Sequence, residues 1–251
     1  MCTTCVKRRT ALALIIPALG LAALAAPATA SATIEPRFPR PPAIGPSRRV
    51  ALTLDACNGG FDRRIADALI AQGARATIFL TADWIRANKQ GLALLLAHPR
   101  VFTFENHGEH HIPPVLGTGT LYGLPIAGTL DAIRREVEQG ARAIQTATGT
   151  TTSWYRGATA RYSPAAIPEI RNLDHAIAAY SLNADEGASL PASTVSSRLA
   201  AARDGDVVIA HINQPNRPSG DGLARAIDAM TSTTWVTLDE LYPQEKTSTS
   251  F

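Results

Sequence analysis

The feature that most constrains the fold of this chain is a regular alternation of strand-like and helix-like segments. From Arg48 onward, short apolar runs alternate with segments of helical periodicity. Repeated units of this kind favour a parallel sheet, because each parallel strand is reached through a crossover connection. The pattern suits both a closed barrel and an open, doubly wound sheet. We therefore predict a single α/β domain over residues 48–251.

The predicted elements also indicate where functional residues should gather. The predicted strands are Val50–Ala56, Ala76–Thr81, Val101–Asn106, Ser153–Arg156, His175–Leu182, Val207–His211 and Trp235–Leu238. Predicted helices span Asp62–Gln72 and Thr129–Thr148, and another helical stretch ends near Ala97. In either architecture, the loops at the carboxyl ends of the strands meet on one face. We expect the site there.

The chain begins with the features of a secretory signal peptide. Basic residues at positions 7–9 precede an uncharged apolar run from Thr10 to Ala26, and Ala28 and Ala30 follow with the spacing of a cleavage site. This run is shorter than the roughly 20 residues of a spanning helix, which favours cleavage over anchoring. We therefore expect residues 1–32 to be removed and the mature protein to be periplasmic or secreted. Both the general and the twin-arginine export routes stay open.

The composition of the remaining chain narrows its partners. The first 32 residues contain three of the 24 basic residues and none of the 21 acidic ones, so 21 of each remain. This balance and the absence of a second long apolar run predict no nucleic acid partner and no stable membrane insertion. Residues 33–47 contain five prolines and are predicted to form an extended linker. Cys57 is the one cysteine beyond residue 32, so we expect a hydrophobic core rather than an internal disulfide to stabilise the domain.

Five polar residues stand at or just beyond the predicted strand ends: Asp55, His107, Arg156, Asp185 and His211. Asp55 follows an apolar run directly, and a carboxylate in that position must be paired or functional. A helix cap or a structural ion pair would also explain it. Arg156 is either a surface arginine packed on aromatic neighbours or a cation that lowers the pKa of a carboxylate. His211 is either a core histidine or an acid–base group, and Asp185 either orients it or caps a turn.

A pair of histidines, His107 and His111, is the strongest metal-binding candidate. If the segment between them is a helical turn, imidazoles four residues apart lie on one face and can share a metal. A solvated polar loop is the alternative. Glu109 could be a further ligand or a base, whereas His98 and His175 are interpreted as structural. A glycine-rich loop over residues 117–128 lacks the spacing of a phosphate-binding motif.

Together these motifs resemble the polysaccharide deacetylase family, also known as the NodB-homology or carbohydrate esterase family 4 group. The resemblance covers roughly residues 48–242. In chain order, the similar segments are Thr53–Cys57 (TLDAC, where the family typically has TFDDG), His107–His111, Tyr155–Ala158, Asn183–Asp185 and Ile209–His211.

The resemblance implies a distorted (β/α) barrel and hydrolysis of the acetamide on an N-acetylated aminosugar glycan, such as peptidoglycan or a chitin-like oligosaccharide. It further implies a divalent metal bound by His107 and His111, with zinc expected before cobalt, nickel or manganese. Asp55 would be the general base and His211 the general acid. Arg156 and Asp185 would tune that base and that acid.

One departure from the family pattern affects the metal site. Ala56 occupies the position of the second aspartate, which is normally the third metal ligand, and an alanine side chain cannot bind a metal. Candidates to replace this ligand are Cys57, Asn58, Asp62 and Asp185. Two other functions remain open: a metal amidohydrolase acting on a small amide, and a non-catalytic glycan-binding relative with a degraded metal site.

Overall fold

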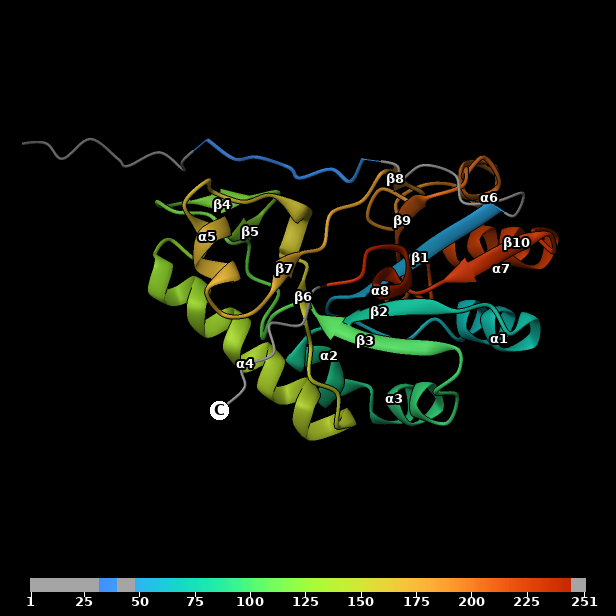
Figure 1. The fold of residues 1–251 in the computed structure, drawn as a ribbon, viewed down its shortest axis with the longest axis horizontal. Helices are drawn as coiled ribbons and strands as arrows, with labels where there is room; N and C mark the ends of the chain where they lie inside the picture. The colour runs from blue at the N-terminus through green and yellow to red at the C-terminus, as the bar shows by residue number, and fades with distance from the viewer. Residues whose placement is uncertain (1–31, 40–47, 245–251) are drawn as a thin grey trace, which may run out of the picture.

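The computed structural model describes residues 32–39 and 48–244 (Figure 1). The predicted signal peptide, apart from Ala32, lies outside the described residues. The part of the proline-rich linker that is described lies extended against the domain. Ile34 forms an antiparallel bridge with Tyr162, and Arg37 forms a parallel bridge with Tyr180.

A parallel sheet curls into a distorted barrel and forms the centre of the domain. Its strand order is β7-β6-β3-β2-β1-β9-β8, and β10 pairs with the first half of β1. Among the described residues, no ladder joins the two outer strands β7 and β8, so the barrel is incomplete. The strands are β1 (Arg48–Ala56), β2 (Ala76–Leu80), β3 (Phe102–Asn106), β6 (Trp154–Tyr155), β7 (Ala176–Ile177), β8 (Leu182–Asn183), β9 (Asp206–His211) and β10 (Thr233–Val236).

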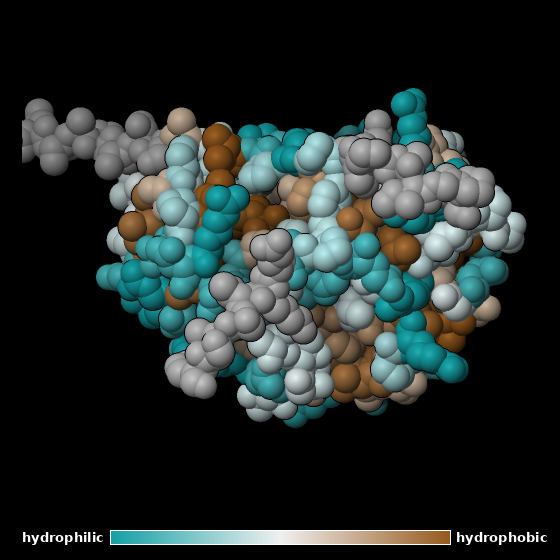
Figure 2. Space-filling model, in the orientation of Figure 1, coloured by the Kyte–Doolittle hydropathy of each residue, from teal (hydrophilic) through white to brown (hydrophobic). Residues whose placement is uncertain are grey.

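Seven helices in the described part of the chain cover the outside of this sheet (Figure 1). They are α1 (Arg63–Gln72), α2 (Ala82–Ala87), α3 (Lys89–Leu96), α4 (Leu130–Thr148), α5 (Ala166–Arg171), α6 (Ala192–Ala200) and α7 (Ser219–Ala229), and there is a 3-10 turn at Ala158–Ala160. The short helix α8 (Leu238–Leu241) instead packs its leucines in the cluster that contains Ala51. The glycine-rich loop forms a small hairpin of β4 (Thr120–Leu121) and β5 (Leu124–Pro125). None of the helices in the described ranges is both long and apolar enough to cross a membrane. Figure 2 shows apolar residues reaching the surface as patches among hydrophilic ones.

The pleat of β1 separates two of the three hydrophobic clusters in the described residues. Val50, Leu52, Leu54 and Ala56 pack in a hydrophobic cluster that includes buried residues of α1 and α7. Ala51 belongs to a second cluster, which contains buried residues of β2 and β9. Alternate residues of a strand point to opposite faces of its sheet. The odd-numbered residues of β1 therefore face the inside of the curled sheet.

Three predicted elements differ from the structure. The helical stretch ending near Ala97 is two helices separated by Asn88, which also bonds back to the carbonyl of Trp84. The predicted strand over residues 175–182 is split into β7 and β8, which lie at opposite edges of the sheet. The last predicted strand ends earlier, because Thr237 forms a capping box with Glu240 and starts α8.

Candidate active site

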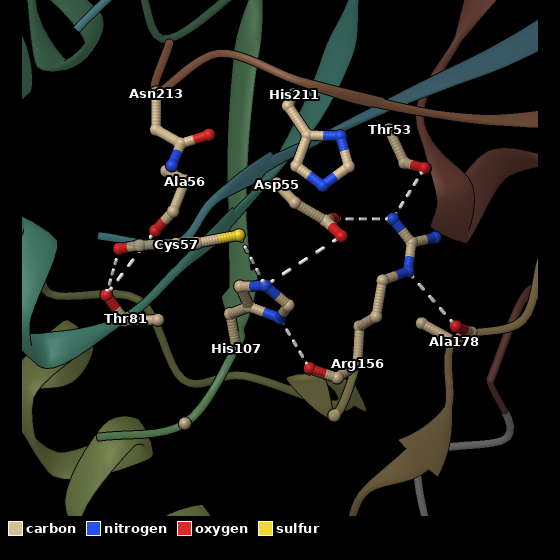
Figure 3. Close-up of polar contacts among 12 residues, drawn as sticks. Thr53, Asp55, Ala56, Cys57, Thr81, His107, Arg156, Ala178, His211 and Asn213 are labelled. Carbon is tan, nitrogen blue, oxygen red and sulfur yellow. Dashed lines mark hydrogen bonds and ion pairs between the residues drawn. The ribbon is translucent and has the colours of Figure 1, made fainter. Parts of the chain in front are cut away.

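Four of the five polar residues predicted at strand ends lie together at the carboxyl end of the sheet in Figure 3: Asp55, His107, Arg156 and His211. Asp55 on β1 is the register partner of His211 on β9, so these two side chains leave neighbouring strands at the same level. His107 directly follows β3, and Arg156 directly follows β6. Asp185 lies two residues beyond β8 and reaches His211. The structure thus brings all five residues to one site.

A buried ion pair holds Asp55. Arg156 has no exposed surface, and its Nη1 donates to Asp55 Oδ1 and to Thr53 Oγ1, each at 2.8 Å. Burial alone would raise the pKa of Asp55, but Arg156, together with His107 and His211, lowers this pKa below its ordinary value of 3.8. The surface-arginine interpretation of Arg156 is therefore wrong. Asp55 is ionised, as a group that accepts a proton must be.

A second carboxylate orients His211. Asp185 is fully buried; its Oδ1 lies 2.9 Å from His211 Nδ1, and its Oδ2 accepts the backbone N–H of His211 at 2.7 Å. Burial would lower the pKa of His211, but Asp185 and the neighbouring Cys57 sulfur raise it well above 6.5. The His211 side chain keeps 17% of its surface exposed. A protonated imidazole is therefore presented to the site.

Three potential metal ligands form a cluster beside Asp55. His107 Nδ1 lies 2.6 Å from the carbonyl oxygen of Arg156, which places His107 Nε2 toward the Cys57 sulfur at 3.3 Å (Figure 3). The rings of His107 and His111 have centroids 4.9 Å apart. One donor atom from each of Cys57, His107 and His111 lies within 4.8 Å of the others. Metal-binding imidazoles are commonly oriented through their second nitrogen in this way, so the residues fit a divalent metal.

The loop between the two histidines is not the helical turn that their spacing suggested. Gly108 and His111 both have positive φ, at 92° and 61°, and the resulting turn brings the two rings together. Glu136 on α4 accepts the backbone N–H of His110 at 3.0 Å and that of Ile112 at 3.1 Å. This buried carboxylate therefore holds the backbone on both sides of His111.

Two polar residues of the same loop take no part in the cluster. The His110 ring extends to Asp83 on α2, with 3.0 Å between His110 Nδ1 and Asp83 Oδ2. The carboxylate of Glu109 lies beside the His110 ring at 3.4 Å. The structure therefore does not group Glu109 with the candidate metal ligands.

Among the four candidates for the missing ligand, Cys57 alone belongs to the cluster. Asn58 is exposed. Asp62 caps α1 and binds Arg64 through Oδ2 at 2.6 Å, so its carboxylate is already engaged. Asp185 is committed to His211.

Three residues that support the site were not predicted from the sequence. Glu136 could have been found as a carboxylate on the apolar face of α4, next to buried Val137. Thr53 precedes Asp55 by two residues and shares its face of β1. Asn106, the last residue of β3, accepts the N–H of Gly108 at 2.9 Å and so fixes the start of the loop that carries His107 and His111.

Comparison with known proteins identifies the relatives of this chain. The family model described as polysaccharide deacetylase matches residues 43–178, more than half of the 251 residues. No match to a curated protein was found.

Several solved structures share the fold. The peptidoglycan deacetylase PdaC from Bacillus subtilis aligns with a TM-score of 0.62 and 18% identity, covering 78% of this chain and 90% of PdaC. The Xyl-CE4 domain of a multidomain xylanase from the hindgut metagenome of Trinervitermes trinervoides has a TM-score of 0.62, 21% identity and the same two coverages. BA3943 from Bacillus anthracis, described as a CE4 family pseudoenzyme, has a TM-score of 0.61 and 17% identity, covering 83% of this chain and 69% of BA3943. These likenesses support the distorted (β/α) barrel.

Proposed function

Because this chain belongs to the polysaccharide deacetylase family and is a carbohydrate deacetylase, we propose that it is an exported, metal-dependent N-deacetylase. The substrate would be an aminosugar glycan, either peptidoglycan or a chitin-like oligosaccharide. The basic and apolar start of the chain supports export to the periplasm or beyond the cell.

The observation that carries this proposal is the presence of an oriented base and an oriented acid beside one metal-ligand cluster. Arg156 holds Asp55 as a carboxylate, and Asp185 holds His211 as an imidazolium. A protein that only binds a glycan needs neither of these buried pairs, each of which carries a desolvation cost.

Each group of the site has a defined role in amide hydrolysis. A divalent ion held by His107 and His111 would polarise the acetamide carbonyl and acidify a water molecule. Asp55 takes a proton from the water as its oxygen bonds to the carbonyl carbon. His211 donates a proton to the amide nitrogen as the carbon–nitrogen bond breaks, leaving acetate and a free amine. Asp185 keeps the His211 ring oriented throughout, and water is the nucleophile.

Acetate release by the purified protein tests this function. We expect stoichiometric divalent metal, and acetate from chitooligosaccharide or from peptidoglycan fragments. His107→Ala should lose both the metal and the activity, whereas His98→Ala, outside the site, should keep both. Stoichiometric metal without acetate from either glycan would contradict the proposed substrate. Acetate from small amides alone would indicate an amidohydrolase, and glycan binding without acetate a non-catalytic relative.

A further inference from the structure

The geometry points to Cys57 as the thiolate that completes the metal site, in place of the carboxylate that position 56 lacks. The donor set is then one sulfur and two imidazole nitrogens, from Cys57, His107 and His111. This inference rests on the proposed function, because it specifies the third ligand of the same metal site. A site of this kind favours zinc over magnesium, calcium or manganese, which prefer oxygen ligands.

The direction of side chains along β1 explains why position 57 takes over from position 56. Leu54 and Ala56 are both buried in the hydrophobic cluster between the sheet and the outer helices. Asp55 points to the opposite face, where it meets Arg156. Alternation continues for one more residue, and the Cys57 sulfur points toward His107 (Figure 3). A cysteine at position 57 therefore reaches the site from the strand's inner face.

The backbone of Cys57 is held in place from the neighbouring strand. The Thr81 hydroxyl, at the start of α2, donates to the Cys57 carbonyl at 2.6 Å, and the Thr81 N–H donates to the Ala56 carbonyl at 3.3 Å. Thr81 has no exposed surface, and the Cys57 residue is only 8% exposed. The thiol thus extends from backbone that is hydrogen-bonded to Thr81 just beyond the end of β1, which suits a metal ligand.

The distance between the two donor atoms also fits a shared ion. Zinc bonds of about 2.3 Å to sulfur and about 2.0 Å to nitrogen, at a tetrahedral angle, place the two ligand atoms about 3.5 Å apart. Cys57 Sγ and His107 Nε2 are separated by 3.3 Å. His107 already has its other nitrogen at a carbonyl, so its Nε2 is available for coordination.

Cobalt substitution tests the inference without depending on catalysis. The protein is prepared with Cys2→Ser and Cys5→Ser, so that Cys57 is its one thiol, and is loaded with Co²⁺. We expect one ion per chain and a sulfur-to-cobalt charge-transfer band in the near ultraviolet. Cys57→Ala should abolish the band and weaken zinc binding by on the order of tenfold or more. Cys57→Asp should bind the ion without the band.

A measurement on the protein with Cys57 intact guards against variants that fail to fold. Cadmium NMR of the same double-serine protein should show the downfield shift that one thiolate ligand produces. Competition between Zn²⁺ and Mn²⁺ should favour zinc strongly, and Cys57→Asp should narrow that preference. A spectrum with oxygen and nitrogen ligands only would overturn the role of Cys57 and leave the metal-dependent deacetylase intact.

Two further outcomes separate this inference from the proposed function. Absence of bound metal in a protein that still releases acetate would overturn the inference and the metal dependence together. Metal binding with the charge-transfer band, but no acetate from any glycan, would support the ligand assignment while contradicting the proposed function.

Discussion

At Arg156 the protein satisfies a fully buried guanidinium entirely from its own groups. Besides Asp55 and Thr53, the side chain donates to two backbone carbonyls and lies over the Phe79 ring at 4.2 Å. Replacing Asp55 by alanine would leave this cation with neither a counter-charge nor an acceptor in place of the carboxylate, which typically costs about 3–5 kcal/mol. A catalytic test at Asp55 therefore needs a substitution that keeps at least the hydrogen-bond acceptor for Arg156.

Asp55→Asn provides that test. The amide oxygen can still accept from Arg156, but the side chain cannot take a proton from water, so we expect the rate of acetate release to fall by about 10²- to 10⁴-fold. Thermal unfolding should confirm that the variant is folded. Asp67→Asn, on the exposed face of α1, is the matched control and should keep full activity. Comparable activity in Asp55→Asn and the control would exclude Asp55 as the base.

His175 illustrates a histidine whose role is structural. It is buried; its Nδ1 lies 2.7 Å from the Leu173 carbonyl oxygen and its Nε2 lies 2.8 Å from the Thr152 hydroxyl. These contacts suit a neutral ring that donates from Nδ1 and accepts at Nε2. Burial lowers its pKa below 6.5. Below pH 6.5 the His175 side chain binds a proton in the unfolded chain but stays neutral in the folded protein. The contribution of neutral His175 to the free energy of unfolding is therefore fully present above pH 6.5, and it is lost as the pH falls through the lower pKa of the folded state.

We expect His175→Gln to lower the free energy of unfolding by about 1–3 kcal/mol at neutral pH, because buried partners lose their hydrogen bonds. The difference from the unsubstituted protein should shrink as the pH falls below 6.5. Denaturant unfolding at several pH values measures both effects. His98→Gln, outside this buried network, is the control, and a constant difference across pH would contradict the interpretation.

At the scale of elements, helix α4 supports the loop that carries His107 and His111. Gly140 lets this helix approach closely, since a Cβ there would lie 2.4 Å from Asn106 Oδ1 and 2.6 Å from the Gly108 carbonyl carbon. Glu136, one turn earlier, then reaches the backbone on either side of His111. The left-handed backbone of His111 is disfavoured for a residue with a side chain, and contacts of this kind maintain it.

Glu136→Ala should therefore weaken zinc binding by about 10- to 100-fold, as loss of a residue that orients metal ligands commonly does. Glu136→Gln keeps an acceptor oxygen and should restore most of the affinity. Competition with a chelating dye measures both variants. Glu138→Ala, near the surface of the same helix, is the matched control. Equal loss of affinity in the alanine and glutamine variants would contradict the positioning role.

At the scale of the whole molecule, the segment of residues 32–39 ties distant parts of the chain together. Phe38 stacks on Tyr242 with ring centroids 4.4 Å apart and meets the edge of Trp154 at 5.8 Å. Glu35 lies 3.3 Å from the Arg161 guanidinium and accepts a hydrogen bond from the Tyr180 hydroxyl. Residues near both ends of the described chain thus pack on β6.

Phe38→Ala should lower the free energy of unfolding by about 1–3 kcal/mol through loss of this aromatic packing. Ile34→Ala removes a side chain that is 43% exposed and should change stability by no more than about 0.5 kcal/mol. Chemical denaturation of the two variants provides the comparison. If Phe38→Ala lowers the free energy of unfolding no more than Ile34→Ala does, the segment contributes little to the stability of the domain.

Much of the architecture followed from the sequence, because hydrophobic periodicity reflects which faces are buried. The strands at β1, β2, β3 and β9 and the helices α1 and α4 lie within a residue or two of their predicted limits. Asp62, Thr129 and Thr237 cap helices, but the sequence indicated only the first two boundaries. The sequence predicts one strand over residues 175–182, but in the structure this continuous run forms β7 at one edge of the sheet and β8 at the other.

The sequence by itself determined that Asp55, His107, Arg156, Asp185 and His211 would stand at strand ends, since a parallel sheet directs its carboxyl ends to one face. Periodicity alone left the pairing of these residues open, because partners such as Asp55 and Arg156 are 101 positions apart, and it was the family resemblance that implied these pairs. Only the tertiary structure decided that Cys57, among four candidates, faces the histidines. It also decided that a carboxylate on α4 holds His111. The reason is physical: periodicity reports which face a side chain occupies, whereas contacts between elements depend on how those faces pack.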